Sequence, residues 1–424
     1  MPARAHIVGA GMAGLACAVR LAASGVAVTL YEATGHAGGR CRSWHDGRLD
    51  RVIDNGSHLL LSGNRAVRAY LAEIGAPDAL AGPDDAALPF LDLADGTRWT
   101  LRPGRGRLPW WLLMPSRRVP GGGTLAHLGG MLRLARAGAT DTVAALLGDN
   151  PLYRRLWEPL AVSVLNTPAE LASARLLARV LDETIGAGGA ACRPLTAPDG
   201  LGAALVDPAL AFLADRGAET LLRHRITGLA RTTGRVTALR LDGATRTLSR
   251  HDRVVLALPP WATAEIHRAA DAPARHHAIV NAHFRLDRPA ALPCGAMLMG
   301  LVGGTAQWLF SRGDVLSVTV SAADDLAARE ADDIAGLLWR DAARALDLPA
   351  EPVPPHRVVK ERRATFSQTP DQDGARPGPA TGYENLYLAG DWTDTGLPAT
   401  VEGAIRSGHA AAAAVLTDIR DISA

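Results

Sequence analysis

Residues 6–14 read HIVGAGMAG, and this stretch decides the fold. A short apolar strand leads into three glycines, Gly9, Gly11 and Gly14, and a helical apolar pattern follows them. A second apolar strand then stops at Glu32. A strand, a glycine turn, a helix, a second strand and an acid in this register predict a dinucleotide-binding βαβ unit.

Each glycine of this turn has a physical role. Gly9 permits the tight turn, Gly11 lets a pyrophosphate approach the backbone, and Gly14 lets the helix pack on the strand. The helix N-terminus offers free N–H groups and a positive dipole end to phosphate. Glu32 lies 18 residues after Gly14, where an acid is expected to bind ribose hydroxyls.

The residues after Glu32 favour a flavin over a nicotinamide cofactor. Gly38-Gly39-Arg40 resembles the GG-Arg motif of the flavin amine oxidase and phytoene desaturase superfamily. The resemblance implies that this loop runs beside the FAD pyrophosphate and that Arg40 approaches the cofactor. Asn55-Gly56-Ser57-His58 stands where that superfamily brings a glycine turn near the flavin. His58 has an equally simple alternative as a loop histidine that bonds to backbone.

The C-terminal part of the chain carries a second matching motif. An apolar strand ends in Gly390-Asp391, and a helix is expected to begin near Val401. The resemblance implies that the Asp391 carboxylate meets the ribityl or phosphate hydroxyls of FAD. The helix N-terminus would face the flavin carbonyl and stabilise negative charge there. Taken alone, Asp391 would be read as a turn or helix-capping residue.

The expected fold is therefore α/β, with a Rossmann-like FAD domain of the two-dinucleotide-binding type and a discontinuous α+β substrate domain. Residues 1–63, 196–265 and 356–424 are assigned to the FAD domain, and residues 64–195 and 266–355 to the substrate domain. Residues 64–195 are expected to be mostly helical, with one helix over 125–147, and residues 276–321 alternate like strands. By the resemblance, the backbone at Ile226 would meet the adenine, although ordinary sheet packing explains that position equally well.

Two further stretches resemble one branch of the superfamily, the hydroxysqualene dehydroxylases of bacterial hopanoid pathways. They are the block at 156–174, which contains Asn166-Thr167-Pro168, and the run at 390–404. This resemblance implies that reduced FAD delivers a hydride to an allylic carbon of hydroxysqualene while the hydroxyl leaves as water. The reaction also needs a proton donor. The candidates are His58, Asp394 and Glu158, although Asp394 also suits a turn and Glu158 an exposed helix face.

The cofactor-binding residues expected from the motifs and the resemblance fall in five short stretches. They are Gly9, Gly11, Met12, Ala13, Gly14, Glu32, Ala33, Gly38, Gly39, Arg40, Asn55, Gly56, Ser57, His58, Ile226, Gly390, Asp391, Thr400, Val401 and Ala404. No cysteine or histidine spacing suggests a metal site.

Composition excludes some classes of function. The net charge is +2, which argues against a nucleic-acid binder. No stretch of 18 uncharged apolar residues occurs, so no bilayer span is expected and a cytoplasmic enzyme is favoured. The segment at 108–115 contains Trp110-Trp111 between arginine-rich flanks, which suits either peripheral contact with the inner face of the plasma membrane or a core-packed loop. The oligomeric state stays open.

Three alternative functions remain at this point. A carotenoid-type desaturase would run the hydride transfer in the opposite direction, and motifs do not reveal direction. An amine oxidase is less favoured, because the only lysine, Lys360, lies in a strand-like run. A prenyl-lipid chaperone of the same fold would bind no flavin, and the intact Gly38-Gly39-Arg40 and Gly390-Asp391 motifs argue against it.

Overall fold

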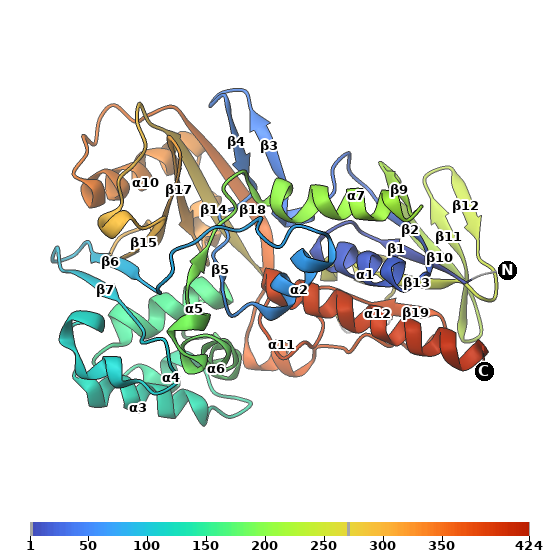
Figure 1. The fold of residues 1–424 in the computed structure, drawn as a ribbon, viewed down its shortest axis with the longest axis horizontal. Coiled ribbons are helices and arrows are strands. Elements are labelled where there is room, and N and C mark those ends of the chain that lie inside the picture. The colour runs from blue at the N-terminus through green and yellow to red at the C-terminus, as the bar shows by residue number, and fades with distance from the viewer. Residues whose placement is uncertain (1–2, 269–271, 424) are drawn as a thin grey trace.

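The computed structural model describes residues 3–268 and 272–423, and it is built around two sheets that lie at opposite ends of an elongated molecule (Figure 1). The first sheet is wholly parallel, with the order β19-β13-β1-β2-β9. Its strands are β1 (Arg4–Val8), β2 (Ala27–Glu32), β9 (Glu219–Leu222), β13 (Arg253–Leu256) and β19 (Leu386–Leu388). Both chain termini lie at this end (Figure 1).

The parallel sheet is covered on both faces, as a sheet of near-continuous apolar strands requires. One face packs against helices through a single core of small and aliphatic residues. These helices are α1 (Met12–Ala23), α2 (Arg65–Glu73), α7 (Asp207–Asp215) and α12 (Val401–Ser423). The other face packs against an antiparallel three-stranded sheet through a second core. That sheet comprises β10 (Ile226–Thr232), β11 (Arg235–Leu241) and β12 (Ala244–Thr247), and α8 (Pro260–Ile266) lies beside it.

The second large sheet has seven strands in the order β18-β14-β17-β16-β15-β6-β7. All its neighbours are antiparallel except β15 and β6, which run parallel. The strands are β6 (Leu88–Asp92), β7 (Arg98–Leu101), β14 (His276–Arg285), β15 (Leu298–Val302), β16 (Trp308–Arg312), β17 (Val315–Val320) and β18 (His356–Phe366). Helices α9 (Asp324–Ala327) and α10 (Ala331–Leu346) share its core.

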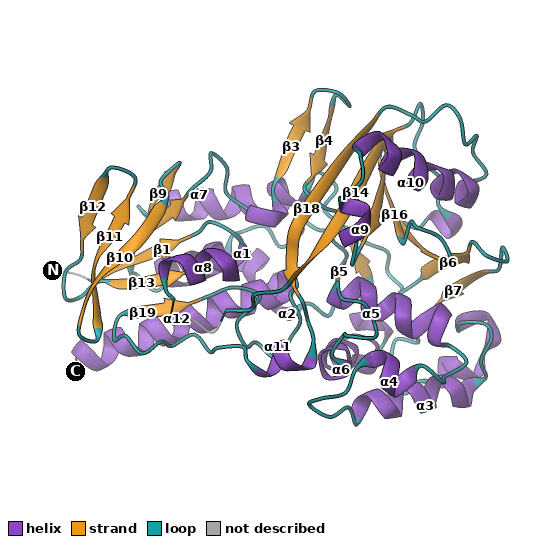
Figure 2. Cartoon of the chain, turned by 180° about the vertical axis from the view of Figure 1, so that it is seen from behind, coloured by secondary structure: helices purple, strands orange, loops and turns teal. Residues whose placement is uncertain are grey.

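A group of helices forms a third layer below β6 and β7 (Figure 2). It contains α3 (Thr124–Ala135), α4 (Val143–Leu147), α5 (Glu158–Leu165) and α6 (Ala174–Glu183). The remaining elements connect the two ends of the molecule. They are the hairpin β3 (Ser43–Asp46) and β4 (Arg51–Asp54), the short pair β5 (Leu60–Leu61) and β8 (Pro194–Leu195), and α11 (Pro370–Gly374).

The predicted α/β class and the parallel dinucleotide-binding sheet are confirmed, but several local predictions were wrong. Residues 64–195 begin with helix α2 as expected, but residues 88–101 form the strands β6 and β7, which pair and extend the second sheet. The helix expected over 125–147 is interrupted between α3 and α4, where the Thr142 side chain caps the second helix. Apolar residues at helical spacing continue across such a break, so the pattern did not reveal it.

The predicted boundary at residue 356 also needs correction. Residues 276–284 of β14 pair with β18 along most of its length, so β18 belongs to the seven-stranded sheet rather than to the parallel one. We therefore propose that the third segment of the FAD domain begins after Phe366. No helix among residues 3–268 and 272–423 is long and apolar enough to cross a membrane.

Helices α1 and α12 touch backbone to backbone, because a glycine stands at their crossing. A Cβ added to Gly408 would lie 2.2 Å from the carbonyl oxygen of Ala13 and 3.0 Å from the Ala16 Cβ. Ala13 is in the first turn of α1, just after the glycine turn. The crossing therefore fixes the C-terminal helix against the start of the dinucleotide-binding helix.

Replacing Gly408 by alanine should force these two helices apart. We expect the free energy of unfolding to fall by about 1–3 kcal/mol, the usual cost of overpacking a tight contact. Thermal unfolding monitored by circular dichroism would measure the change. The matched control is Gly336→Ala in α10, where no atom lies within 4 Å of an added Cβ, so alanine should be neutral or stabilising. Equal melting temperatures for the two variants would contradict this account of the crossing.

Candidate functional site

The glycine turn after β1 has the geometry that the sequence predicts. Gly9 has φ +104°, and an added Cβ would lie 2.5 Å from the Ala257 carbonyl oxygen, so a side chain is excluded on both grounds. An added Cβ at Gly14 would lie 1.9 Å from the carbonyl oxygen of Gly9. Gly11 differs, because no atom lies within 4 Å of the place where its Cβ would stand. The turn is closed on the protein side and open where a pyrophosphate would approach.

Glu32 ends β2 directly beside this turn. Its Oε2 accepts a hydrogen bond from the Ala10 backbone N–H at 3.1 Å, and its Oε1 accepts one from the Thr34 N–H at 2.8 Å. The carboxylate is thus held next to the glycine turn, with lone pairs left for hydroxyl donors. The His224 N–H donates to the Glu32 carbonyl oxygen at 2.8 Å. Ile226, the buried first residue of β10, follows two residues later.

The Gly38-Gly39-Arg40 loop lies against the glycine turn. The Gly38 N–H donates to the Ala10 carbonyl oxygen at 2.7 Å, and Gly38 forms a bridge with Gly11. Arg40 then reaches the C-terminal motif, where its guanidinium pairs with the Asp391 carboxylate at 2.8 Å and donates to the Ala364 carbonyl oxygen. Burial lowers the pKa of Arg40, but the Asp391 carboxylate outweighs burial and the net pKa is raised.

Asp391 is buried and follows a glycine that is itself tied to α12. The Gly390 N–H donates to the Ser407 hydroxyl oxygen at 2.9 Å. Thr400 precedes Val401, the first residue of α12, and its hydroxyl oxygen accepts a hydrogen bond from the Gly403 N–H at 3.0 Å. Ala404 is buried one turn into the helix. The first turn of α12 is therefore fixed next to the carboxylate that pairs with Arg40.

The Asn55-Gly56-Ser57 turn is held by the middle of β14. The Asn281 amide oxygen accepts hydrogen bonds from the Ser57 N–H at 3.4 Å and from the Thr319 hydroxyl at 2.7 Å. An added Cβ at Gly56 would lie 3.1 Å from the Asn281 amide nitrogen. Asn55 is buried and donates to the Glu361 carboxylate on β18 at 3.3 Å. This turn joins the parallel-sheet half of the molecule to the seven-stranded sheet.

These groups fit an FAD molecule. The open face at Gly11, the N–H groups at the start of α1, and the half-exposed Arg40 suit the negative charge of a pyrophosphate. Glu32 suits ribose hydroxyls beside it. The exposed Gly39 leaves the backbone of its loop accessible. The first turn of α12 lies near Asp391. The N-terminus of this helix would favour negative charge on a flavin ring.

The three candidate proton donors lie in different surroundings. His58 is half-buried beside the Arg40 backbone, and its pKa is lowered by burial and then by the Arg40 guanidinium. Asp394 is exposed, and its carboxylate accepts a hydrogen bond from the Gly396 N–H at 3.1 Å, as a turn residue does. Glu158 begins α5, and its pKa is raised by burial and then by Glu170. Within the described residues, His58 alone of the three contacts Arg40.

Sequence reasoning missed the residues that support the site from the second sheet. Asn281 and Glu361 hold the glycine turn at 55–57. Gln368 is fully buried, and its amide oxygen accepts a hydrogen bond from the Ala399 N–H at 2.8 Å, just before α12. No motif marks a buried amide in a strand or loop, so a pattern reading had no means of finding these contacts.

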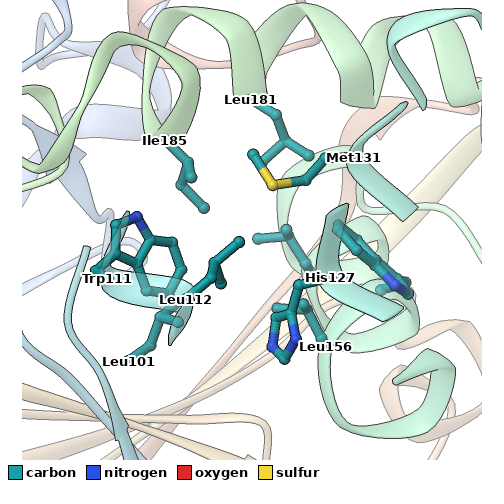
Figure 3. A pocket seen from close by; sticks show the side chains of 10 residues that line it. Leu101, Trp111, Leu112, His127, Met131, Leu156, Leu181 and Ile185 are labelled. Atoms are coloured by element: carbon teal, nitrogen blue, oxygen red, sulfur yellow. The ribbon is translucent and has the colours of Figure 1, made fainter. Parts of the chain in front are cut away.

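A separate apolar cavity lies in the helical layer (Figure 3). It has a volume of about 30 Å³. The residues that line it come from β7, the 110–113 turn, α3, α5, α6 and their neighbours: Leu101, Trp111, Leu112, His127, Met131, Leu156, Trp157, Leu160, Leu181 and Ile185. His127 is buried, and its Nε2 has no hydrogen-bond partner in the described part of the chain. Burial lowers its pKa, so the imidazole is neutral at pH 7.

The Trp110-Trp111 segment has one tryptophan in the core and one on the surface. It forms a 3₁₀ turn over Trp110–Leu113. Trp111 is buried and lines the cavity, whereas Trp110 is 66% exposed. Adjacent residues of a tight turn point in different directions, so one tryptophan packs in the core while its neighbour faces outward.

Replacing Glu32 by alanine should weaken cofactor retention, because the carboxylate beside the glycine turn is lost. We expect the flavin-to-protein ratio of the purified variant, measured by absorbance, to fall well below that of the parent. Glu219→Ala is a control, since Glu219 lies on neighbouring β9 and its carboxylate accepts a hydrogen bond from the Thr29 hydroxyl at 3.4 Å, within the sheet. Unchanged flavin content in Glu32→Ala would remove Glu32 from the site.

Arg40 and Asp391 should be energetically coupled. In a double-mutant cycle with Arg40→Gln and Asp391→Asn, we expect a coupling of about 0.5–3 kcal/mol in the free energy of unfolding, the range for contacting residues. Denaturant unfolding of the four proteins would measure it. Additive effects of the two substitutions would show that the pair does not tie the two motifs together.

Comparison with known proteins agrees with this geometry. A family model described as flavin containing amine oxidoreductase matches residues 12–416. A hydroxysqualene dehydroxylase from Sinorhizobium fredii is 44% identical over 422 residues, which cover 99% of this chain and 99% of that protein. A hydroxysqualene dehydroxylase from Rhodopseudomonas palustris is 45% identical over 413 residues, or 97% of this chain and 98% of that protein.

A solved structure shows the same fold at much lower identity. Cyclohexylamine oxidase from Brevibacterium oxydans IH-35A superposes with a TM-score of 0.75 at 16% identity, covering 100% of each chain. The predicted resemblance to the flavin amine oxidase superfamily, and within it to hydroxysqualene dehydroxylases, is confirmed. The chain belongs to the flavin containing amine oxidoreductase family and is an FAD-dependent oxidoreductase.

Proposed function

We propose that this oxidoreductase converts hydroxysqualene to squalene in squalene and hopanoid biosynthesis. The observation that carries the proposal is near-full-length similarity, at 42% identity or more, to three proteins named hydroxysqualene dehydroxylase. It is supported by the complete set of motifs around the parallel sheet. We infer that FAD lies along the Gly9–Gly14 turn, Glu32, the Arg40 loop, the 55–58 turn and the start of α12.

The reaction replaces a hydroxyl by hydrogen and releases water. Reduced FAD, when bound, supplies the hydride for the allylic carbon, and a proton is needed for the departing hydroxyl. The protein would hold the cofactor through the residues above and keep water from the reacting carbon with its apolar substrate half. The turn at 55–58 is anchored to Asn281 of the second sheet, so the cofactor loops and the substrate half have a fixed relation.

His58 is poorly suited to donate that proton at neutral pH. Its pKa is lowered from the ordinary value of 6.5 by burial and by Arg40, so the imidazole is neutral at about pH 7 and above. Glu158 has the opposite shift, since burial and Glu170 raise its pKa. We therefore keep Glu158 and Asp394 as the candidates for the donor, whereas His58 would serve as a neutral hydrogen-bonding group beside Arg40.

The pH dependence of turnover tests this reading of His58. We expect His58→Gln to retain the parent's pH profile between about pH 7 and about pH 8.5, because the histidine carries no proton to lose there. Initial rates of squalene formation would measure it. A profile that falls with pH in the parent and becomes flat in His58→Gln would identify His58 as the acid.

Product analysis tests the function itself. The purified protein, supplied with a chemical reductant under anaerobic conditions, should convert hydroxysqualene to squalene, identified by mass spectrometry. The same protein in its oxidised form, offered a carotenoid precursor such as phytoene, should form no desaturated product. Desaturation of phytoene without squalene formation would favour the carotenoid-type alternative. A colourless protein with no activity on either compound would favour the prenyl-lipid chaperone.

The lipid character of this substrate bears on where the protein works. We propose peripheral contact with a membrane surface through the exposed Trp110 and its neighbours. Tryptophan beside arginine is a residue pair suited to the interface between headgroups and acyl chains.

A further inference from the structure

Large apolar side chains that face solvent are concentrated in one region. Of the nine that are exposed among the described residues, six fall within residues 108–132. We call these six the outer patch: Leu108, Trp110, Leu113, Met114, Leu125 and Leu132. The exposed fractions of Leu125 and Leu113 reach 83% and 61%. A concentration of exposed apolar side chains of this kind points to an interaction site.

The 108–114 turn and α3 form one continuous surface. A shallow hollow is lined by Leu108, Pro109, Trp110 and Leu113 together with Thr124 and Leu128 of α3. Arg118 fixes the two pieces to each other, because its guanidinium donates to the Thr124 hydroxyl at 2.7 Å and to the Leu112 carbonyl oxygen. The outer patch therefore lies on two segments that are hydrogen-bonded to each other through Arg118.

The chain segment that carries the outer patch has charges of one sign only. Residues 96–140 contain eight arginines and no aspartate or glutamate. Acids from elsewhere in the chain pair with three of the eight, namely Arg98, Arg105 and Arg133. Arg107 and Arg117, which flank Trp110 on either side, have no ion-pair partner in the described part of the chain. An apolar patch within a positive field fits a surface with an apolar interior and anionic headgroups.

The inner side of the same segment faces the apolar cavity. Trp111 and Leu112 line it, as do His127 and Met131 of α3 (Figure 3). One turn of chain therefore separates the outer patch from the cavity. The cavity volume of about 30 Å³ holds about two water molecules, so a long hydrocarbon cannot enter unless the segment moves.

We propose that the outer patch docks on an anionic lipid bilayer and that the 108–118 segment is the gate through which an isoprenoid chain passes from the bilayer into the cavity behind it. This inference rests on the proposed function for its substrate. Direct transfer spares the chain from water, where exposing a long hydrocarbon is unfavourable. The arginines hold the patch at the headgroups, while Trp110 and Leu113 enter the acyl region.

Vesicle binding tests the docking surface. The patch variant carries Trp110→Ser and Leu113→Ser, which change only exposed side chains. The control variant carries Val52→Ser and Leu171→Ser. These two side chains are also exposed, by 45% and 48%, and they lie far from the patch in sequence. We expect the parent and the control to co-sediment with phosphatidylglycerol vesicles and not with phosphatidylcholine vesicles. The patch variant should bind at least tenfold more weakly.

Equal vesicle binding by the patch variant and the control, or no binding by the parent, would overturn the docking surface. A dimer in size-exclusion chromatography that the patch variant breaks, without vesicle binding by the parent, would likewise overturn it and assign the patch to self-association. None of these vesicle-binding and size-exclusion readouts depends on turnover, so failure of the proposed function and failure of the docking surface remain distinguishable.

A reversible crosslink tests the gate. A Cβ added to Gly104 would lie 3.7 Å from the Trp111 Cβ, within the range that a disulfide spans. Gly104 is itself anchored, because its carbonyl oxygen accepts a hydrogen bond from the Gly189 N–H at 2.6 Å. Gly104→Cys with Trp111→Cys would therefore pin the segment shut when oxidised. Cys294, the exposed cysteine, is replaced by serine in all proteins compared.

The crosslinked and reduced forms of this one variant are compared, so the cost of losing Trp111 is common to both. With hydroxysqualene supplied in vesicles, we expect turnover to be at least tenfold slower in the oxidised form and to recover on reduction. Flavin content should be the same in both. Equal rates in the two redox states, with the disulfide verified by thiol titration, would overturn the gate.

Discussion

The contact between Arg40 and Asp391 joins two motifs that are about 350 positions apart, and the functional half of the molecule depends on it. The guanidinium comes from the loop that lies on the glycine turn, and the carboxylate comes from the end of β19. The same guanidinium also bonds to the carbonyl oxygen of Ala364, at the end of β18 in the second sheet. One side chain thus brings together the N-terminal nucleotide fold, the C-terminal helix and the substrate half.

Close backbone contacts between helices hold the segments that carry Arg40 and Asp391 in place. Gly408 allows α12 to lie on the first turn of α1, and Gly14 allows α1 to lie on its own glycine turn. A side chain at either place would displace α1 or α12. The glycines therefore act through packing, and we propose that this packing aligns the N-termini of the two helices with one elongated cofactor.

The sequence predicted the parallel sheet and its loops well, because their local geometry requires particular residue types at fixed positions. These are the glycine turn, Glu32, Gly38-Gly39-Arg40 and Gly390-Asp391. The predicted cofactor residues lie in the stretches that converge on α1 and α12. The substrate half was harder. Asn166 illustrates why: it adopts φ +45° at the end of α5 and links that helix to residues His277, Ala322 and Thr365. Its motif was visible, but its long-range partners were not. Strands β6 and β7 were missed as well, because their hairpin joins the seven-stranded sheet only through β15, about 200 residues after β6.

We propose that this protein transfers a hydride from reduced FAD to a hydroxylated triterpene. The most direct measurement is an anaerobic single turnover in which the reduced protein is mixed with hydroxysqualene while flavin absorbance and squalene are followed together. We expect the flavin to be reoxidised and one squalene to form for each flavin oxidised. A flavin that stays reduced, with no squalene formed, would contradict the assigned substrate and direction.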